Sequence, residues 1–204
     1  MIVETIQNAL SNAWPMLVIF LSIVVIVRIT YLSSNSRKVV LYEEVLSFFF
    51  IVYVLLLFEL LTSTESGSFG SNLIPFTEIT RYPIGSKLFF FNVIGNIVIF
   101  MPFGFYVSYY CKLKHIVPIF LISTVTSAIV EIVQFKIGRA FDVDDIILNV
   151  LGGVIGYLIY IGLTAIKKRL PKFFSNSIFI NIVVLLLSAG IVYLFYHFIG
   201  FGWF

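Results

Sequence analysis

The residues of this sequence best suited to chemistry are carboxylates and amides between positions 92 and 149. Glu131 and Gln134 are three residues apart, so they share one face of a helix. Asp145 and Asn149 are four residues apart and lie one above the other on the next helical segment. Side chains of these types bind polar groups, transfer protons or hold a hard divalent cation.

Further polar residues lie between and before these two segments. Arg139 and Asp142 belong to the connecting turn, and Asn92 and Asn96 are one helical turn apart upstream. We expect one polar pocket made by Asn92, Asn96, Glu131, Gln134, Arg139, Asp142, Asp144, Asp145 and Asn149. Within it, the candidates for acid–base chemistry are Glu131, Asp142 and Asp145.

Each of these residues also has a purely structural interpretation. Glu131 and Arg139 can pair and hold two helices together, and Asp144 or Asp145 can cap a helix N-terminus. The amides upstream, such as Asn96, can bond one helix to another without binding any ligand. The sequence leaves the structural and the functional interpretations open.

Composition indicates which elements must position these residues. The chain has 204 residues, of which 60% are hydrophobic and 11% are charged. Soluble domains carry about 25% charged residues, so we expect a bundle of membrane-spanning helices instead. The net charge of +3 comes in short clusters without the continuous basic face that nucleic acid requires. Cys111 is the single cysteine, which excludes a disulfide within the chain.

Six runs of roughly 20 mostly apolar residues predict six spans and an all-α, polytopic transmembrane bundle. The runs cover residues 14–32, 40–61, 88–110, 116–135, 145–166 and 178–199. Pro102 predicts a kink or a break within the third span. We divide the chain into residues 1–71 with an interfacial segment and two spans, 72–166 with three spans, and 167–204 with a basic loop and the last span.

The distribution of basic residues predicts the orientation of the bundle. Alternate short loops carry eight of them, which are Arg37, Lys38, Lys112, Lys114, Lys167, Lys168, Arg169 and Lys172. The opposite loops carry four, which are Arg81, Lys87, Lys136 and Arg139. The richer side belongs in the cytoplasm, so both termini are expected outside. At 1.5 Å per residue, Asn96, Glu131 and Asn149 then lie roughly 5–12 Å inside the outer boundary.

The central part of the chain, about residues 72–157, resembles the VanZ-like family, named for a protein associated with resistance to the lipoglycopeptide teicoplanin. The matching pieces are Asn72–Phe76, Asn92, Gly95–Asn96, Phe100–Gly104, Ser127, Glu131, Gln134, Gly138–Asp145, Asn149, Gly152, Gly153 and Gly156–Tyr157. The resemblance implies a multi-pass protein of the bacterial cell membrane, but it implies no particular reaction. The first two spans and the last lie outside it.

Two functions from different classes follow. In the first, the pocket binds the headgroup of an envelope lipid or lipid-linked precursor, which changes its presentation and links the protein to teicoplanin resistance. In the second, the protein is an intramembrane enzyme that modifies such a lipid, with Glu131 as base and with or without a divalent cation. The sequence contains no Ser–His or Cys–His pair in favour of the enzyme. Ion-coupled transport is a weaker third hypothesis.

Overall fold

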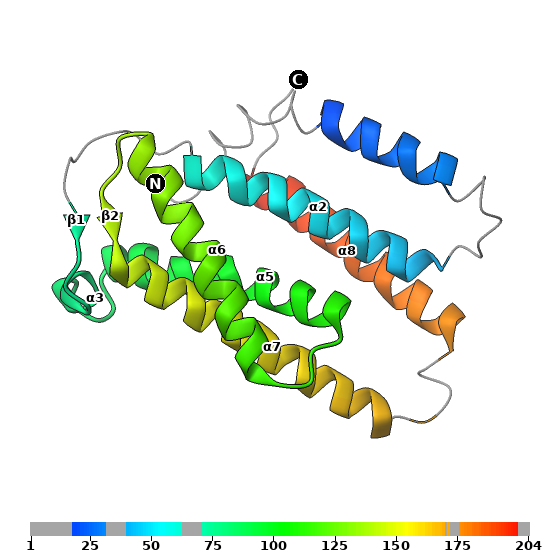
Figure 1. The fold of residues 1–204 in the computed structure, drawn as a ribbon. Coiled ribbons are helices and arrows are strands. Elements are labelled where there is room, and N and C mark those ends of the chain that lie inside the picture. Colours follow the sequence, from blue (N-terminus) through cyan, green and yellow to red (C-terminus); the bar gives the residue numbers. More distant parts are fainter. Residues whose placement is uncertain (1–17, 32–39, 63–70, 170, 172–175, 200–204) are drawn as a thin grey trace. The chain divides into compact units, whose positions relative to one another are not determined.

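The computed structural model of this protein describes residues 18–31, 40–62, 71–169, 171 and 176–199, and most of these are helical (Figure 1). The predicted interfacial segment before residue 14 lies outside the described residues. The chain forms two compact units, one of residues 61–166 and one of residues 1–60 with 167–204.

Helices at both ends of the chain make up the terminal unit. They are Val18–Tyr31, α2 (Leu41–Thr62) and α8 (Ser177–Ile199). Arg28 donates two hydrogen bonds, of 2.8 and 2.7 Å, to the carboxylate of Glu44 and thereby joins the first helix to α2. The side-chain oxygen of Asn181 accepts the backbone N–H of Tyr42 at 3.1 Å, which joins α8 to the first turn of α2.

The central unit contains the predicted polar residues. Its elements are β1 (Ser71–Asn72), α3 (Thr77–Arg81), α4 (Lys87–Phe89), η1 (Phe90–Ile94), α5 (Gly95–Cys111), α6 (Ile116–Lys136), β2 (Phe141–Asp142) and all but the last three residues of α7 (Val143–Arg169). A continuous helix from Lys87 to Cys111 comprises α4, the π-helical turn η1 and α5. It is not broken at Pro102, since the fixed φ of proline is compatible with a helix even though one backbone bond is lost.

Glycines bring α5 and α7 into direct backbone contact. A Cβ atom added to Gly152 would lie 2.2 Å from the carbonyl oxygen of Ile97, and one added to Gly156 would lie 2.1 Å from that of Met101. No side chain fits at such distances, so the close approach requires glycine at both positions. Small residues serve the same purpose in membrane bundles generally, because they allow extensive van der Waals contact between helices.

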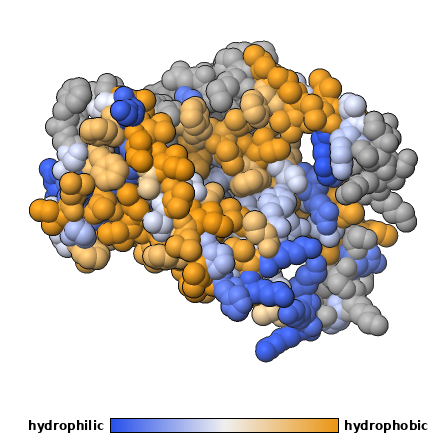
Figure 2. Space-filling model, in the orientation of Figure 1, coloured by the Kyte–Doolittle hydropathy of each residue, from blue (hydrophilic) through white to orange (hydrophobic). Residues whose placement is uncertain are grey.

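Among the described residues, four helices are long and apolar enough to cross a membrane. They are Leu41–Glu59, Lys87–Cys111, Ile116–Lys136 and Val143–Arg169. These helices coincide with the second to fifth predicted spans, and apolar side chains cover much of their visible surface (Figure 2). The helical membrane-protein class is therefore confirmed, whereas a total of six spans and the outer placement of both termini stay predictions.

Candidate functional site

Residues 71–86, which we call the cap, lie beside the start of α7 (Figure 1). The cap contains β1 and α3. It joins the rest of the central unit through a short parallel pairing of β1 with β2, in which Ser71 is opposite Phe141 and Asn72 is opposite Asp142. This pairing places the cap at the end of the helices where the predicted polar residues gather.

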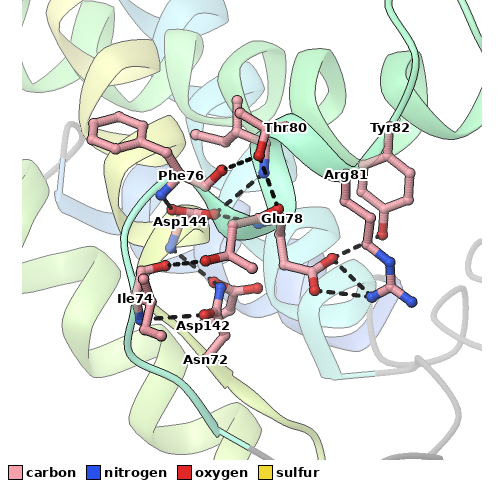
Figure 3. A network of polar contacts seen from close by, with 11 residues as sticks. Asn72, Ile74, Phe76, Glu78, Thr80, Arg81, Tyr82, Asp142 and Asp144 are labelled. Carbon is pink, nitrogen blue, oxygen red and sulfur yellow. Dashed lines mark hydrogen bonds and ion pairs between the residues drawn. The ribbon is translucent and has the colours of Figure 1, made fainter.

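Asp144 attaches the cap to α7. Its carboxylate is 1% exposed and accepts three backbone N–H groups of the cap, those of Phe76 at 2.5 Å, Glu78 at 2.7 Å and Ile79 at 3.2 Å (Figure 3). These groups belong to the first turn of α3, where helical N–H groups lack a partner within the helix. Asp144 therefore caps a helix N-terminus, that of α3, which precedes it by more than 60 residues.

Asp142 caps α7, because that helix begins at the next residue. One of its carboxylate oxygens accepts the backbone N–H of Asp144 at 2.8 Å and the side-chain amide of Asn72 at 3.0 Å. Burial raises the pKa of the Asp142 carboxyl, and the nearby charges of Asp144 and Glu78 act in the same direction, against the effect of the two hydrogen bonds. Asn72 was absent from the predicted site, although it begins the first motif of the family resemblance.

Glu131 lies on α6 and is almost completely buried, with 1% exposure. Its carboxylate accepts the backbone N–H of Asp142 at 3.0 Å and so joins α6 to β2. Gln134 is buried on the same face, as the spacing predicts. Its backbone oxygen accepts the N–H of Arg139 at 3.0 Å. The charge of Arg139 acts on both Glu131 and Asp145, so this cation belongs to the same cluster.

Two amide side chains connect the long helices below the cap. The amide of Asn96 on α5 donates to the carboxylate of Asp145 on α7 at 2.5 Å. The amide of Asn149 on α7 donates to the hydroxyl of Ser127 on α6 at 2.9 Å, in a buried position. Asn92 lies in η1, is half-buried and makes no side-chain hydrogen bond within the described part of the chain. Side chains of three helices thus meet at one end, but their role as ligands stays a prediction.

Helix α3 contributes a polar group that was absent from the predicted site. The carboxylate of Glu78 accepts a hydrogen bond from Arg81 at 2.9 Å and one from the hydroxyl of Tyr82 at 3.2 Å (Figure 3). Burial and the charge of Glu78 raise the pKa of Tyr82 above its usual value. The charge of Asp145 also reaches Tyr82. The three-residue and four-residue spacings from Glu78 are typical of helical side-chain pairs and were visible in the sequence.

The carboxylates of the site have protein donors as partners. Across the described residues, no group of three or more His, Cys, Asp or Glu side chains is arranged to hold a metal ion. Asp144 uses both carboxylate oxygens for the N–H groups of the cap, and Asp142 uses one for Asp144 and Asn72. The divalent cation that the sequence left open therefore has no preformed ligand set in this part of the chain.

Two serines on α6 provide a matched pair for a stability test. The hydroxyl of Ser123 is buried against Gly153 and has no hydrogen-bond partner among the described residues, whereas Ser127 accepts a bond from Asn149. We expect Ser123→Ala to leave thermal stability unchanged or slightly higher. Ser127→Ala should cost about 1–2 kcal/mol, because it leaves a buried amide unpaired. Thermal unfolding in detergent measures both, and equal effects of the two substitutions would contradict the assignment.

The apolar helices and the buried polar cluster at one end define this chain as a helical membrane protein with a polar site. The sequence model of the VanZ/LLP1 family matches residues 18–167, and the chain therefore belongs to this family. It is also similar to Protein VanZ of Enterococcus faecium, with 34% identity over 118 residues, which is 57% of this chain and 67% of that protein. No solved structure matches the chain.

The extent of the family match corrects one expectation. The first two predicted spans were placed outside the resemblance, but the match begins at residue 18 and so includes most of the first span and all of the second. Long apolar helices carry few distinctive residues, so this part of the family pattern is difficult to recognise by eye. The last predicted span, which begins at residue 178, lies outside the match as expected.

Proposed function

We propose that this chain is a multi-pass protein of the bacterial cell membrane that binds the headgroup of an envelope lipid or lipid-linked precursor. The binding site is the polar cluster beneath the cap, at the outer end of α5, α6 and α7. Membership of the VanZ/LLP1 family and the four apolar helices support the location. The chemistry of the cluster supports the ligand class.

The observation that carries this proposal is the Asn96–Asp145 bridge, with the charge of Arg139 acting on Asp145 and Glu131. The backbone contacts at the glycines already pack α5 against α7, so the bridge is not needed to join these helices. Ionisable side chains in a span cost up to about 2.5–3.5 kcal/mol at the bilayer centre and less near its ends. Retaining two carboxylates at this end is therefore better explained by a polar ligand than by helix packing.

The side chains suit a headgroup that combines phosphate with hydroxyl or amide groups. Arg139 can take a phosphate oxygen through its planar guanidinium, which presents several N–H donors at once. The amides of Gln134 and Asn92 and the hydroxyl of Tyr82 can bond sugar or peptide groups. A site of this composition favours lipid-linked envelope precursors over lipids with only an apolar or a cationic head.

Protection from teicoplanin is the expected consequence of such binding. The VanZ-like family takes its name from a protein associated with resistance to this lipoglycopeptide, which carries an acyl tail and acts at the outer membrane surface. A protein that changes how an envelope lipid is presented at that surface would alter the sites available to the antibiotic. The proposed link therefore needs no chemical modification of the drug.

Neutralising the two carboxylates tests the site. We expect Glu131→Gln and Asp145→Asn each to abolish teicoplanin protection while the protein stays in the membrane, because each amide removes a negative charge that interacts with Arg139 in the proposed site. Minimum inhibitory concentrations at equal expression measure the effect. Glu43→Gln is the control, because this exposed carboxylate lies in the first turn of α2. Full protection by both site variants would refute the proposal.

Analysis of the envelope lipids distinguishes a binding function from a catalytic one. Mass spectrometry of lipids from cells with and without the protein should show the same species, with one class enriched in the purified protein. A new or missing lipid species would instead indicate an intramembrane enzyme. Purified protein without any co-purified envelope lipid would contradict the binding function.

A further inference from the structure

The cap exposes large apolar side chains to an unusual degree. Ile84 is 90% exposed, Ile74 is 70% exposed, Leu73 is 67% exposed and Phe76 is 58% exposed. Four such side chains on a segment of sixteen residues, 71–86, make an apolar patch that water solvates poorly. On the helix that follows, Leu88 and Phe90 are exposed as well.

Hydrogen bonds to Asp144 and Asp142 order the part of the cap that carries Leu73, Ile74 and Phe76. Phe76 has φ 68, a left-handed conformation that is costly for a bulky residue. Its N–H donates to the buried carboxylate of Asp144, which also accepts the N–H groups of Glu78 and Ile79 (Figure 3). Asn72 is bound to Asp142, and its side-chain oxygen accepts the N–H of Ile74 at 3.2 Å. The exposure of the patch is therefore a feature of an ordered segment.

Two helices independently indicate the depth of the cap. Lys112 follows α5 and Lys167 lies in the last turn of α7, and lysines in such positions mark a headgroup layer. A helix of about 20 residues crosses a hydrocarbon core of roughly 30 Å. Counted back from Lys112 and Lys167, this length ends at Asn92 on one helix and at Ile147 on the other, which marks the opposite edge of the hydrocarbon. Both helices continue about four or five residues further before they meet the cap, which places the cap roughly 6–8 Å beyond the hydrocarbon, within the headgroup layer.

We propose that the cap is a membrane-inserting element whose apolar side chains, Leu73, Ile74, Phe76 and Ile84, enter the acyl region of the adjacent leaflet. The apolar patch of the cap contacts the lipid bilayer and not another protein. The patch is followed along the chain by exposed apolar side chains at the start of the helix Lys87–Cys111, and its depth lies within reach of the acyl chains. Exposed cations on the same end, Lys87 and Lys136, are placed to meet anionic headgroups. The insertion holds the end of the central unit that carries the polar cluster at the level of the headgroups.

Depth-dependent quenching of a fluorescent label tests the insertion. The full chain with Cys111→Ser carries one new cysteine, Ile84→Cys or Leu73→Cys, labelled with an environment-sensitive fluorophore. Lys114→Cys, in the exposed loop between α5 and α6, is the control. The protein is studied in nanodiscs of phosphatidylcholine and phosphatidylglycerol, which leave both faces accessible to quenchers.

Labels at residues 84 and 73 should emit at shorter wavelength than the label at residue 114. Lipids with a nitroxide near the top of the acyl chain should quench them about twofold, as expected for side chains at the headgroup–acyl boundary. Aqueous iodide should quench the control strongly and the cap labels weakly. Strong iodide quenching at 84 and 73, or resistance to both quenchers, would overturn the proposal. The outcome does not depend on whether the polar cluster binds a headgroup.

Discussion

The variant Gly104→Ala is expected to lose about 3 kcal/mol or more of stability, the upper part of the range for over-packed cores. A Cβ atom on Gly104 would lie 2.0 Å from the carbonyl oxygen of Gly153 and 2.6 Å from the carbonyl carbon. Both are backbone atoms, so no side chain can rotate away. The two helices would have to separate, which would also pull apart the Asn96–Asp145 bridge at the same interface.

Thermal unfolding in detergent measures this loss, and Gly162→Ala on α7 is the matched control. A Cβ atom on Gly162 would meet nothing within 4 Å. Because alanine favours the helix by about 1 kcal/mol over glycine, the control should be neutral or slightly stabilised. If both variants unfold at the same temperature, α5 and α7 do not pack through their backbones.

The variant Asp144→Ala is expected to release the cap from the start of α7. Its carboxylate accepts three backbone N–H groups of the cap in a site that is 1% exposed. Hydrogen bonds to a charged partner contribute about 1.5–3 kcal/mol each, and their losses are not additive, so we expect a local destabilisation of about 3–4 kcal/mol. Hydrogen–deuterium exchange of peptides covering residues 76–79 should accelerate correspondingly, while exchange in α6 should change little.

Two further variants show whether faster exchange in the cap is due to the loss of the Asp144 carboxylate. Asp144→Asn keeps one acceptor oxygen and should give an intermediate acceleration of exchange. Glu78→Gln weakens an exposed pair with Arg81, whose side chain is 66% exposed, and such pairs contribute less than about 1 kcal/mol. Exchange in the Asp144→Ala variant as slow as in Glu78→Gln would show that Asp144 does not hold the cap.

The site combines residues with a structural role and residues that are available to a ligand. Asp144 and Asp142 are committed to joining the cap to α7, whereas Asp145 and Glu131 lie among side chains that can also serve a ligand. Defects in Asp144 variants should therefore follow loss of local structure. Defects in Asp145→Asn or Glu131→Gln, which keep a side-chain acceptor oxygen, should appear without that loss. Hydrogen exchange measured beside the resistance assay therefore distinguishes the two groups.

The sequence by itself determined the helices of the bundle. Bilayer thickness sets both the length and the apolar character of a span, so runs of residues such as 116–135 identify helices directly. The periodicity of the α-helix then placed Glu131 and Gln134 on one face, where the structure buries both. The family assignment also followed from the sequence, because motif residues and their spacing are retained without knowledge of contacts.

Only the tertiary structure decided which partner each polar residue has. Asn72 binds Asp142 across 70 residues of chain, and Asp144 caps a helix 66 residues before it, so no local pattern indicates either bond. The π-helical turn Phe90–Ile94 is equally absent from any periodicity. Hydrophobicity and helical spacing are properties of neighbouring residues, whereas these contacts depend on the path of the loops, which is decided when the whole central unit packs.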